Sequence, residues 1–188
     1  MEQMIVGLVL FFGVHAVPMF PSVRHKIVNK VGGVLYQTVF ALLSLAGLVL
    51  LVWGHASADY IELWPEPDWA RHVTFLLMLP VLPILITAYL PGQLRRWIPH
   101  PMLMVVKIWA VAHLLVNGDL ASVLLFGAFL VYGVLDLVSI KRRQRASGQK
   151  VKIGPWRNDV IAVLLGLALY IGMVIWGHSA LIGVALIG

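Results

Sequence analysis

Long runs of apolar residues, separated by short polar segments, dominate this chain. A transmembrane α-helix needs about 20 mostly apolar residues to cross the hydrocarbon core of a bilayer. Six runs approach this length, and most of the charges lie between them. We therefore predict an all-α polytopic membrane helical bundle with about six transmembrane helices, at residues 4–20, 34–54, 72–90, 102–116, 120–140 and 160–177. The C-terminal residues after the sixth run are apolar but too few to cross again, so they should extend the sixth helix.

The polar segments alternate in charge along the chain. Segments 22–33, 91–101 and 141–157 are basic, whereas segment 55–71 is acidic. The fourth turn, Asn-Gly-Asp, carries only Asp119, which is placed to cap the fifth helix. Because Lys and Arg are enriched in cytoplasmic loops, the alternation predicts cytoplasmic odd loops and both termini outside. With no room for a separate soluble domain, we expect one transmembrane domain over residues 1–188.

Composition supports a membrane protein and narrows its chemistry. Hydrophobic residues make up 61% of the 188 residues and charged residues 12%, against about 25% charged in a soluble domain. The net charge of +6 would suit nucleic acid, but basic loops on a membrane protein more often set its topology. We therefore expect the lipid bilayer, and no nucleic acid, as a partner. The absence of cysteine excludes disulfides, thiolate catalysis and cysteine-ligated metals.

Two of the seven histidines stand inside apolar runs. His15 lies in the first run and His113 in the fourth, whereas the others fall in loops or near run edges. A neutral imidazole carries one donor and one acceptor, and both need partners in lipid. Ligation of a metal such as haem iron would satisfy the acceptor nitrogen. A hydrogen-bonded packing role would satisfy it without metal, and the residues alone leave both interpretations open.

Two charged residues also lie within apolar runs, where ionisable groups are functional candidates by default. Lys107 is near the cytoplasmic end of the fourth run, where its amine can extend toward the surface. Asp136 lies on the fifth run, which returns antiparallel to the fourth through the turn at Gly118. Equal distances from that turn set Asp136 against His100, whose tautomer it would fix, or in an ion pair with Arg96.

The stretch HPMLMVVKIWAVAHLLVNGDLAS at residues 100–122, together with LVLLVWG at residues 48–54, resembles the NnrU family of bacterial inner-membrane proteins. The resemblance covers nearly the whole chain. It implies a multi-pass protein of the bacterial inner (cytoplasmic) membrane that supports denitrification or nitric oxide metabolism, with respiratory or denitrification membrane proteins as partners. The same stretch is more distantly similar to the haem-containing zeta-carotene isomerase of plants, through the His-Pro step and the Ala-His thirteen residues later.

The similarity to the isomerase implies a haem b cofactor. It puts the axial ligands of the iron at His15 and His113. Trp109 lies one helical turn before His113 on the same face, where its ring would flank the porphyrin. The remaining candidate contacts with the cofactor are His100, Asp136 and, toward a propionate, Lys107.

One geometric argument opposes this pair of ligands. Counted from the cytoplasmic side, His15 lies about five residues deep and His113 about twelve, so at about 1.5 Å per residue their depths differ by roughly 10 Å. Helix tilt or a kink at Pro18 would close part of that gap. His100 is the alternative ligand, because it lies on the cytoplasmic side, nearer to His15.

Three classes of function stay open. The first is a haem-b protein that acts in denitrification, nitric oxide metabolism or a redox-linked isomerisation. The second is a non-enzymatic membrane accessory or a small-molecule permease, whose buried charges line a path. The third is a membrane methyltransferase related to the isoprenylcysteine enzymes, ranked last because their Arg-His-Pro step reads Pro-His-Pro here, at residues 99–101. No nucleophile–base pair or phosphate-binding loop marks the chain as an enzyme.

The charge alternation predicts the outcome of reporter fusions. A reporter that works only in the cytoplasm should be active when fused at Gly148, because the basic fifth loop is retained on that side, and silent when fused at Gly188. A reporter that works only outside the membrane gives the reciprocal control at both positions. Cytoplasmic activity at the C-terminus would contradict the topology.

Overall fold

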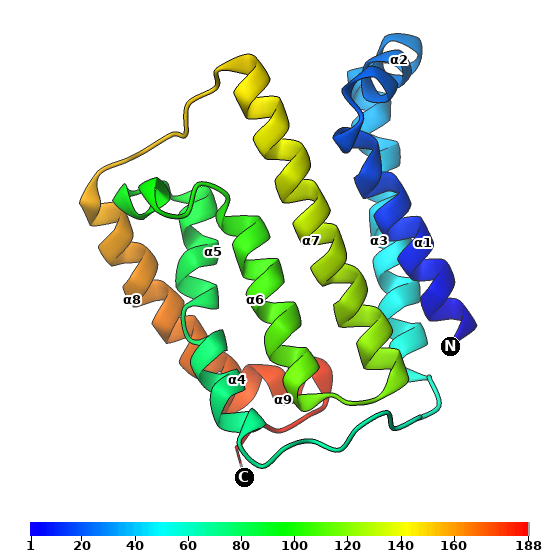
Figure 1. Ribbon diagram of the computed structural model, residues 1–188, viewed down its shortest axis with the longest axis vertical. Coiled ribbons are helices and arrows are strands. Elements are labelled where there is room, and N and C mark those ends of the chain that lie inside the picture. The colour runs from blue at the N-terminus through cyan, green and yellow to red at the C-terminus, as the bar shows by residue number, and fades with distance from the viewer. Residues whose placement is uncertain (188) are drawn as a thin grey trace. The chain divides into compact units, whose positions relative to one another are not determined.

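The structure of the protein is a computed structural model that describes residues 1–187, and it is built from α-helices (Figure 1). Residues 1–187 contain no β-strand, which confirms the all-α prediction; an isolated bridge joins Glu62 to Asp119. A 3-10 helix η1 (Val17–Met19) follows the first helix, η2 (Gln93–Arg96) precedes α6, and a π-helical turn η3 (Met173–Gly177) follows α8. The α-helices are α1 Glu2–Ala16, α2 Pro21–Val31, α3 Gly33–Ala56, α4 Ala70–Met78, α5 Val81–Tyr89, α6 Pro101–Val116, α7 Leu120–Ser147, α8 Trp156–Gly172 and α9 His178–Ile182.

The helices form two compact units. The first unit contains residues 1–65 and 117–143, and therefore α1, α2, α3 and most of α7. The second contains residues 66–116 and the described residues from 144 on, and therefore α4, α5, α6, α8 and α9. Each unit is described by itself below.

Five segments are long and apolar enough to cross a bilayer, and they coincide with five of the six predicted spans. They are Glu2–Met19, Gly33–Ala56, Ala70–Tyr89, Leu120–Ser147 and Trp156–Ile182. The remaining prediction corresponds to α6, which has 16 residues and is about 24 Å long against a hydrocarbon core of about 30 Å. Within the second unit α6 packs along both α4 and α5, which together make one full span. This packing favours a crossing by α6 as well.

Glycines hold the first two spans of the first unit in close contact. In Figure 1, α1 and α3 lie side by side. A Cβ atom added at Gly7 would lie 2.5 Å from the Leu51 backbone nitrogen, and one added at Gly54 would collide with the Met4 backbone. Small residues permit such close helix approach, which replaces the hydrophobic driving force that is absent between helices in lipid.

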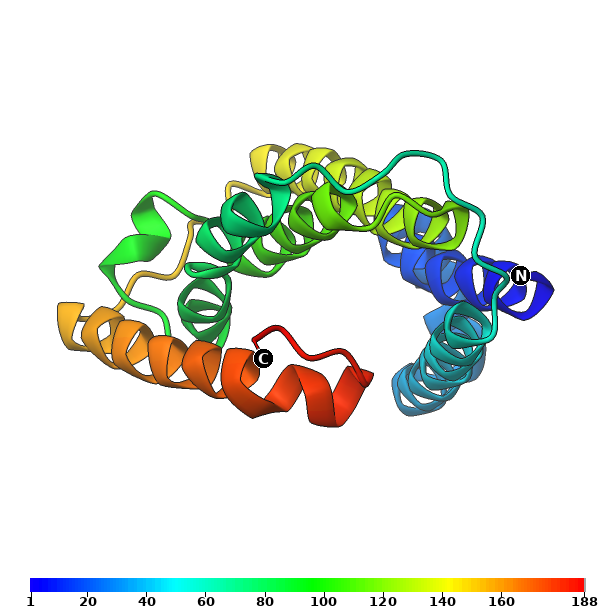
Figure 2. The same ribbon diagram turned by 90° about the horizontal axis from the view of Figure 1, so that it is seen from below.

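Prolines shape the second unit. Pro80 divides the third predicted span into α4 and α5, since proline removes a helical hydrogen bond and its ring clashes with the preceding turn. Pro83 packs so tightly on Gly166 of α8 that no side chain fits there. Figure 2 shows α8, in orange, running alongside the green helices of this unit. The third span is therefore made of two helices, α4 and α5, that meet at Pro80.

Two segments expected as loops are helical. The basic segment after the first span contains α2, which begins at Pro21, a residue favoured at the first helical position. The fifth loop was expected to begin at residue 141, but α7 continues through the first basic residues of that loop, up to Arg145, and ends at Ser147. Lys, Arg and Gln are good helix formers, so an established helix extends through them at little cost. The C-terminal extension of the sixth span is confirmed, and it ends at Gly183 with a left-handed φ of 83°.

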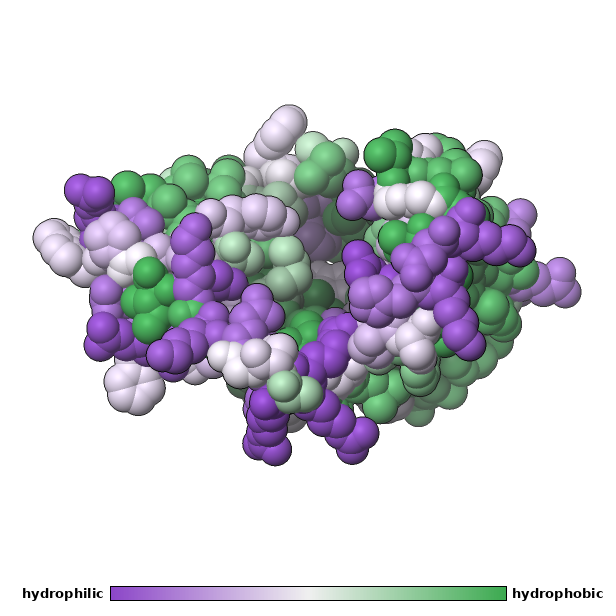
Figure 3. Space-filling model, turned by 90° about the horizontal axis from the view of Figure 1, so that it is seen from above, coloured by the Kyte–Doolittle hydropathy of each residue, from purple (hydrophilic) through white to green (hydrophobic). Residues whose placement is uncertain are grey.

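Contacts within the first unit place its basic and acidic ends apart. Ser139 and Arg143 of α7 donate hydrogen bonds to the backbone carbonyls of Met19 and Pro18 in η1, beside basic α2. At the other end, the Leu63 amide donates to the Gly118 carbonyl, beside Asp119. Figure 3, seen from above, shows hydrophilic side chains gathered over the helix ends. This arrangement agrees with the alternation of charge.

The α1–α3 contact predicts opposite effects at two glycines of α1. Gly7→Ala should lower the free energy of unfolding by about 1 to 3 kcal/mol, because the new methyl group collides with the backbone of α3. Gly13→Ala is the matched control: nothing lies within 4 Å of its added Cβ, so it should be neutral or slightly stabilising. Unfolding of both variants in detergent measures the difference. Equal effects would contradict the close contact.

Candidate functional site

His15 lies one residue before the end of α1, half-buried in the first unit. Its Nδ1 atom is 2.7 Å from the carbonyl oxygen of Phe11, one turn earlier in the same helix. A carbonyl oxygen only accepts, so Nδ1 carries the hydrogen and donates it. The lone pair of the neutral ring then lies on Nε2, the nitrogen that a metal would bind.

Aromatic rings surround His15. The Phe11 ring stacks on the imidazole with centroids 4.1 Å apart, and the Phe40 ring of α3 lies 5.0 Å away. From α7, Tyr132 donates a hydrogen bond of 3.3 Å to the His15 carbonyl oxygen. One turn before and one turn after Phe40 on α3, the hydroxyl oxygens of Tyr36 and Ser44 are buried with no hydrogen-bond partner. The surroundings of His15 are therefore flat and apolar, with unused hydrogen-bonding capacity close by.

His113, on α6 of the second unit, makes the same kind of hydrogen bond as His15. Its Nδ1 atom is 2.8 Å from the carbonyl oxygen of Trp109, again four residues earlier, so Nε2 carries the lone pair. The Trp109 and His113 ring centroids lie 5.1 Å apart, which confirms that the two rings share a face of the helix. Thr74 of α4 donates to the neighbouring Ala112 carbonyl at 2.9 Å and fixes this part of α6 against α4.

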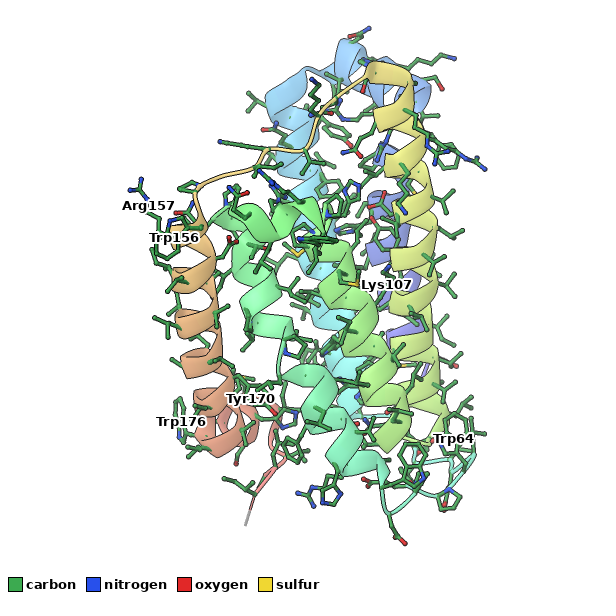
Figure 4. The ribbon with its side chains drawn as sticks, turned by 60° about the vertical axis from the view of Figure 1, so that its left-hand side comes forward. Trp64, Lys107, Trp156, Arg157, Tyr170 and Trp176 are labelled. Carbon is green, nitrogen blue, oxygen red and sulfur yellow. The ribbon has the colours of Figure 1, made fainter. Side chains whose placement is uncertain are left out.

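The other two candidates of the second unit lie toward the start of α6. The carbonyl of His100 accepts the first helical hydrogen bond, from the Met104 amide at 3.1 Å. Lys107 is half-buried on the same helix, where Figure 4 labels it. Within the described residues no carboxylate lies within ion-pair distance of its amine. A cation in this position retains the capacity to bind an anionic group.

Asp136 of the first unit has a partner on its own helix. The Arg143 Nη2 atom lies 3.6 Å from Asp136 Oδ1, and the Asp136 side chain is only 15% exposed. The same guanidinium also donates to the Pro18 carbonyl oxygen. Residues seven apart on a helix lie on one face, so this pair was detectable in the sequence but was not predicted. The proposed pairing of Asp136 with His100 or Arg96 stays a prediction.

Asp119 caps α7, as the sequence predicted. Its carboxylate accepts the Ser122 amide hydrogen at 3.0 Å, and the Ser122 hydroxyl lies 3.1 Å from His55 Nε2. Burial acts to raise the pKa of Asp119, but the hydrogen bonds from Ser122 and the nearby His55 outweigh it, so the pKa lies below its ordinary value. The stability that this carboxylate contributes is therefore present above its unfolded-state pKa and is lost as pH falls through the folded-state pKa.

The family model described as NnrU protein matches residues 3–186 of the chain. The chain belongs to the NnrU family. No curated protein and no solved structure matches it. The assignment therefore rests on nearly the whole length of this NnrU-family chain, which includes both units.

The structure distributes the candidate residues of this NnrU-family protein over its two units. His15 and Asp136 belong to the first unit. In the second unit, Lys107, Trp109 and His113 lie on α6, and His100 directly precedes it. Among residues 1–187 no three His, Asp or Glu side chains gather as a metal site. Axial ligation of haem needs only two such side chains.

Sequence reasoning also missed two further features of this NnrU-family chain. Tyr36 and Ser44 were not singled out as the buried hydroxyls beside Phe40, although their spacing of four residues to either side was visible. His178 was placed in a loop or near a run edge, yet its Nδ1 atom also lies 2.8 Å from a backbone carbonyl oxygen, that of Val184. The bond joins the first residue of α9 to a carbonyl beyond the end of that helix, so only the fold shows it.

The pair of Asp136 and Arg143 predicts a coupling that can be measured. In a double-mutant cycle, Asp136→Asn and Arg143→Gln should be non-additive by about 0.5 to 1 kcal/mol, because each change removes the same ion pair. Arg142→Gln, one residue earlier on α7, is the matched control and should add independently to Asp136→Asn. Additivity in both cycles would contradict the ion pair. The same cycle with His100→Ala tests the pairing predicted from the sequence.

Proposed function

We propose that this NnrU-family protein is a multi-pass protein of the bacterial inner membrane that binds haem b, with His15 and His113 as the axial ligands. One observation carries the proposal. Both histidines lie in apolar helices, and both donate Nδ1–H to the carbonyl oxygen four residues earlier. The hydrogen bond fixes the tautomer and the ring orientation and directs the Nε2 lone pair away from the helix.

This hydrogen bond is what a metal-binding histidine needs. Histidines that bind metals almost always donate their other ring N–H to a carbonyl, carboxylate or water, which raises the basicity of the ligating nitrogen. In lipid, the Nε2 lone pair of a histidine also needs a partner. A metal ion with an open coordination position supplies one. His15 and His113 lie on different helices and make the same Nδ1 hydrogen bond, so together they would supply the two axial ligands of a low-spin haem.

The surroundings of His15 suit a flat, largely apolar group with polar edges. Phe11 and Phe40 present rings to the imidazole, and the buried hydroxyls of Tyr36 and Ser44 lack partners that a propionate or an accompanying water would supply. On α6, Trp109 is placed to flank the porphyrin beside His113. Lys107, His100 and Asp136 are the further cofactor contacts, with Lys107 directed to a propionate.

Bound haem b would supply one-electron chemistry, while the residues of this chain hold the group, exclude water and neutralise its propionates. Membership of the NnrU family supports a role in denitrification or nitric oxide metabolism. A redox-linked isomerisation is the alternative reaction for the same site. Partners in either case are respiratory or denitrification membrane proteins.

A second function is a non-enzymatic membrane accessory or small-molecule permease. The observation that favours it is the ion pair of Asp136 with Arg143, which places an ionised carboxylate on an apolar helix. A protein of this class would bind no haem and would keep its function when His15 and His113 are replaced. A membrane methyltransferase is ranked last, because residues 99–101 depart from its motif.

Haem ligation predicts a specific visible spectrum. Protein made with ample haem should be coloured when purified, and after reduction it should show the sharp bands of low-spin bis-histidine haem b. His15→Ala or His113→Ala should abolish or convert those bands, because each removes one axial ligand. His25→Ala on exposed α2 and His178→Ala are the controls and should leave the spectrum unchanged.

Two outcomes would contradict the proposal in different ways. A colourless protein would exclude haem and favour the accessory function. If His113→Ala kept the low-spin bands and His100→Ala lost them, the second ligand would be His100. That outcome would resolve the depth difference of roughly 10 Å between His15 and His113 that residue spacing gives.

A further inference from the structure

A groove opens at one end of the second unit, between η2 and the first turns of α8. Its volume is about 490 Å³, within the range of sites that hold small ligands. One wall comes from the segment around η2 and the other from α8. The groove is lined by Gln93, Leu94, Arg96, Trp97, Asp159, Val160, Val163 and Leu164.

Hydrogen bonds fix the two walls to each other. The Asp159 carboxylate accepts the backbone N–H groups of Gln93 and Leu94 at 2.7 and 3.1 Å. The Gln93 side chain donates to the Gly154 carbonyl oxygen at 2.6 Å, and the Asn158 side chain donates to the Pro91 carbonyl oxygen at 2.7 Å. These hydrogen bonds hold the groove in shape before any ligand binds. The Asp159 carboxylate is already hydrogen-bonded to backbone amides of η2.

Arg96, the other charged residue that lines the groove, makes no ion pair within the described residues. Arg96 is exposed, and within residues 1–187 no carboxylate lies within ion-pair distance of its guanidinium. Arg157 adds a further positive charge at the start of α8, where Figure 4 labels it beside Trp156. The groove therefore offers a cation to an incoming anion.

The rest of the groove is apolar and faces outward. Val160, Val163 and Leu164 lie at helical spacing on one face of α8 and are 43%, 38% and 65% exposed. The Trp97 ring stands at the rim and is 84% exposed. Tryptophan favours the headgroup layer of a membrane, so its position marks the depth of the groove at the interface.

From these features we infer that the groove binds one anionic phospholipid, such as phosphatidylglycerol. The phosphate lies against Arg96, the glycerol region against Trp97, and an acyl chain follows Val160, Val163 and Leu164 down α8. Charge complementarity selects an anionic headgroup, and the basic segments at this end of the unit place it on the cytoplasmic leaflet, which is rich in anionic lipids. The apolar wall favours a lipid over a free anion, and the inference is independent of haem binding.

Native mass spectrometry of the full chain in neutral detergent tests this inference. Phosphatidylglycerol and phosphatidylcholine with the same acyl chains are added at equal concentration, and phosphatidylglycerol should be retained in preference. Arg96→Gln should weaken its retention about fivefold, the value of one cationic contact at a membrane surface. Val163→Trp should also weaken retention, because it fills the groove. Arg142→Gln on α7 removes one positive charge outside the groove and should leave retention unchanged.

Three outcomes would overturn the inference. The first is equal retention of the two lipids by the unaltered protein. The second is an equal loss in the Arg96→Gln and Arg142→Gln variants, which would reflect net charge alone. The third is displacement of phosphatidylglycerol by inorganic phosphate, which would make the groove a site for a free anion. Thermal unfolding of each variant, with the midpoint of the unaltered protein as reference, verifies that the loss comes from a folded protein.

Discussion

Without water in the bilayer core, every polar hydrogen of a membrane protein needs an acceptor inside the protein. The helical backbone meets this demand for its own amides, and side chains then use the remaining lone pairs of its carbonyl oxygens. Thr74, Tyr170, His15 and His113 all donate to backbone carbonyls. For the two histidines this has a chemical consequence, because binding Nδ1–H to the backbone leaves Nε2 as the basic nitrogen.

The close contact of α1 and α3 determines what surrounds His15. Gly7, Gly47 and Gly54 allow the two helices to touch at backbone distance, so Phe40 reaches the imidazole from α3. On the same helix, α3, the hydroxyls of Tyr36 and Ser44 are buried without hydrogen-bond partners. Each buried polar group without a hydrogen bond costs about 1 to 3 kcal/mol of stability. If stability alone determined these positions, we would expect the hydroxyls to have partners or apolar residues to replace them. Their presence one helical turn to either side of Phe40, which contacts His15, favours a functional site at this histidine.

The positions of the spans could be predicted from the sequence because burial in lipid depends on composition over about 20 residues, a local property. The Asp119 cap and the shared face of Trp109 and His113 were predictable for the same reason, because both follow from spacing along one helix. The groove beside Arg96 was not, because it needs Asp159 to bind amides 65 and 66 residues away. The helical extension of α7 was missed because a basic segment forms either a loop or a helix, and charge alone does not distinguish them.

Electron paramagnetic resonance of the ferric protein tests the central claim, haem held by two imidazoles, most directly. The account predicts a low-spin signal whose nitrogen hyperfine couplings change when histidine alone is labelled with nitrogen-15, because both axial ligands are then labelled while the porphyrin is not. A high-spin signal, or a low-spin signal that histidine labelling leaves unchanged, would contradict the account.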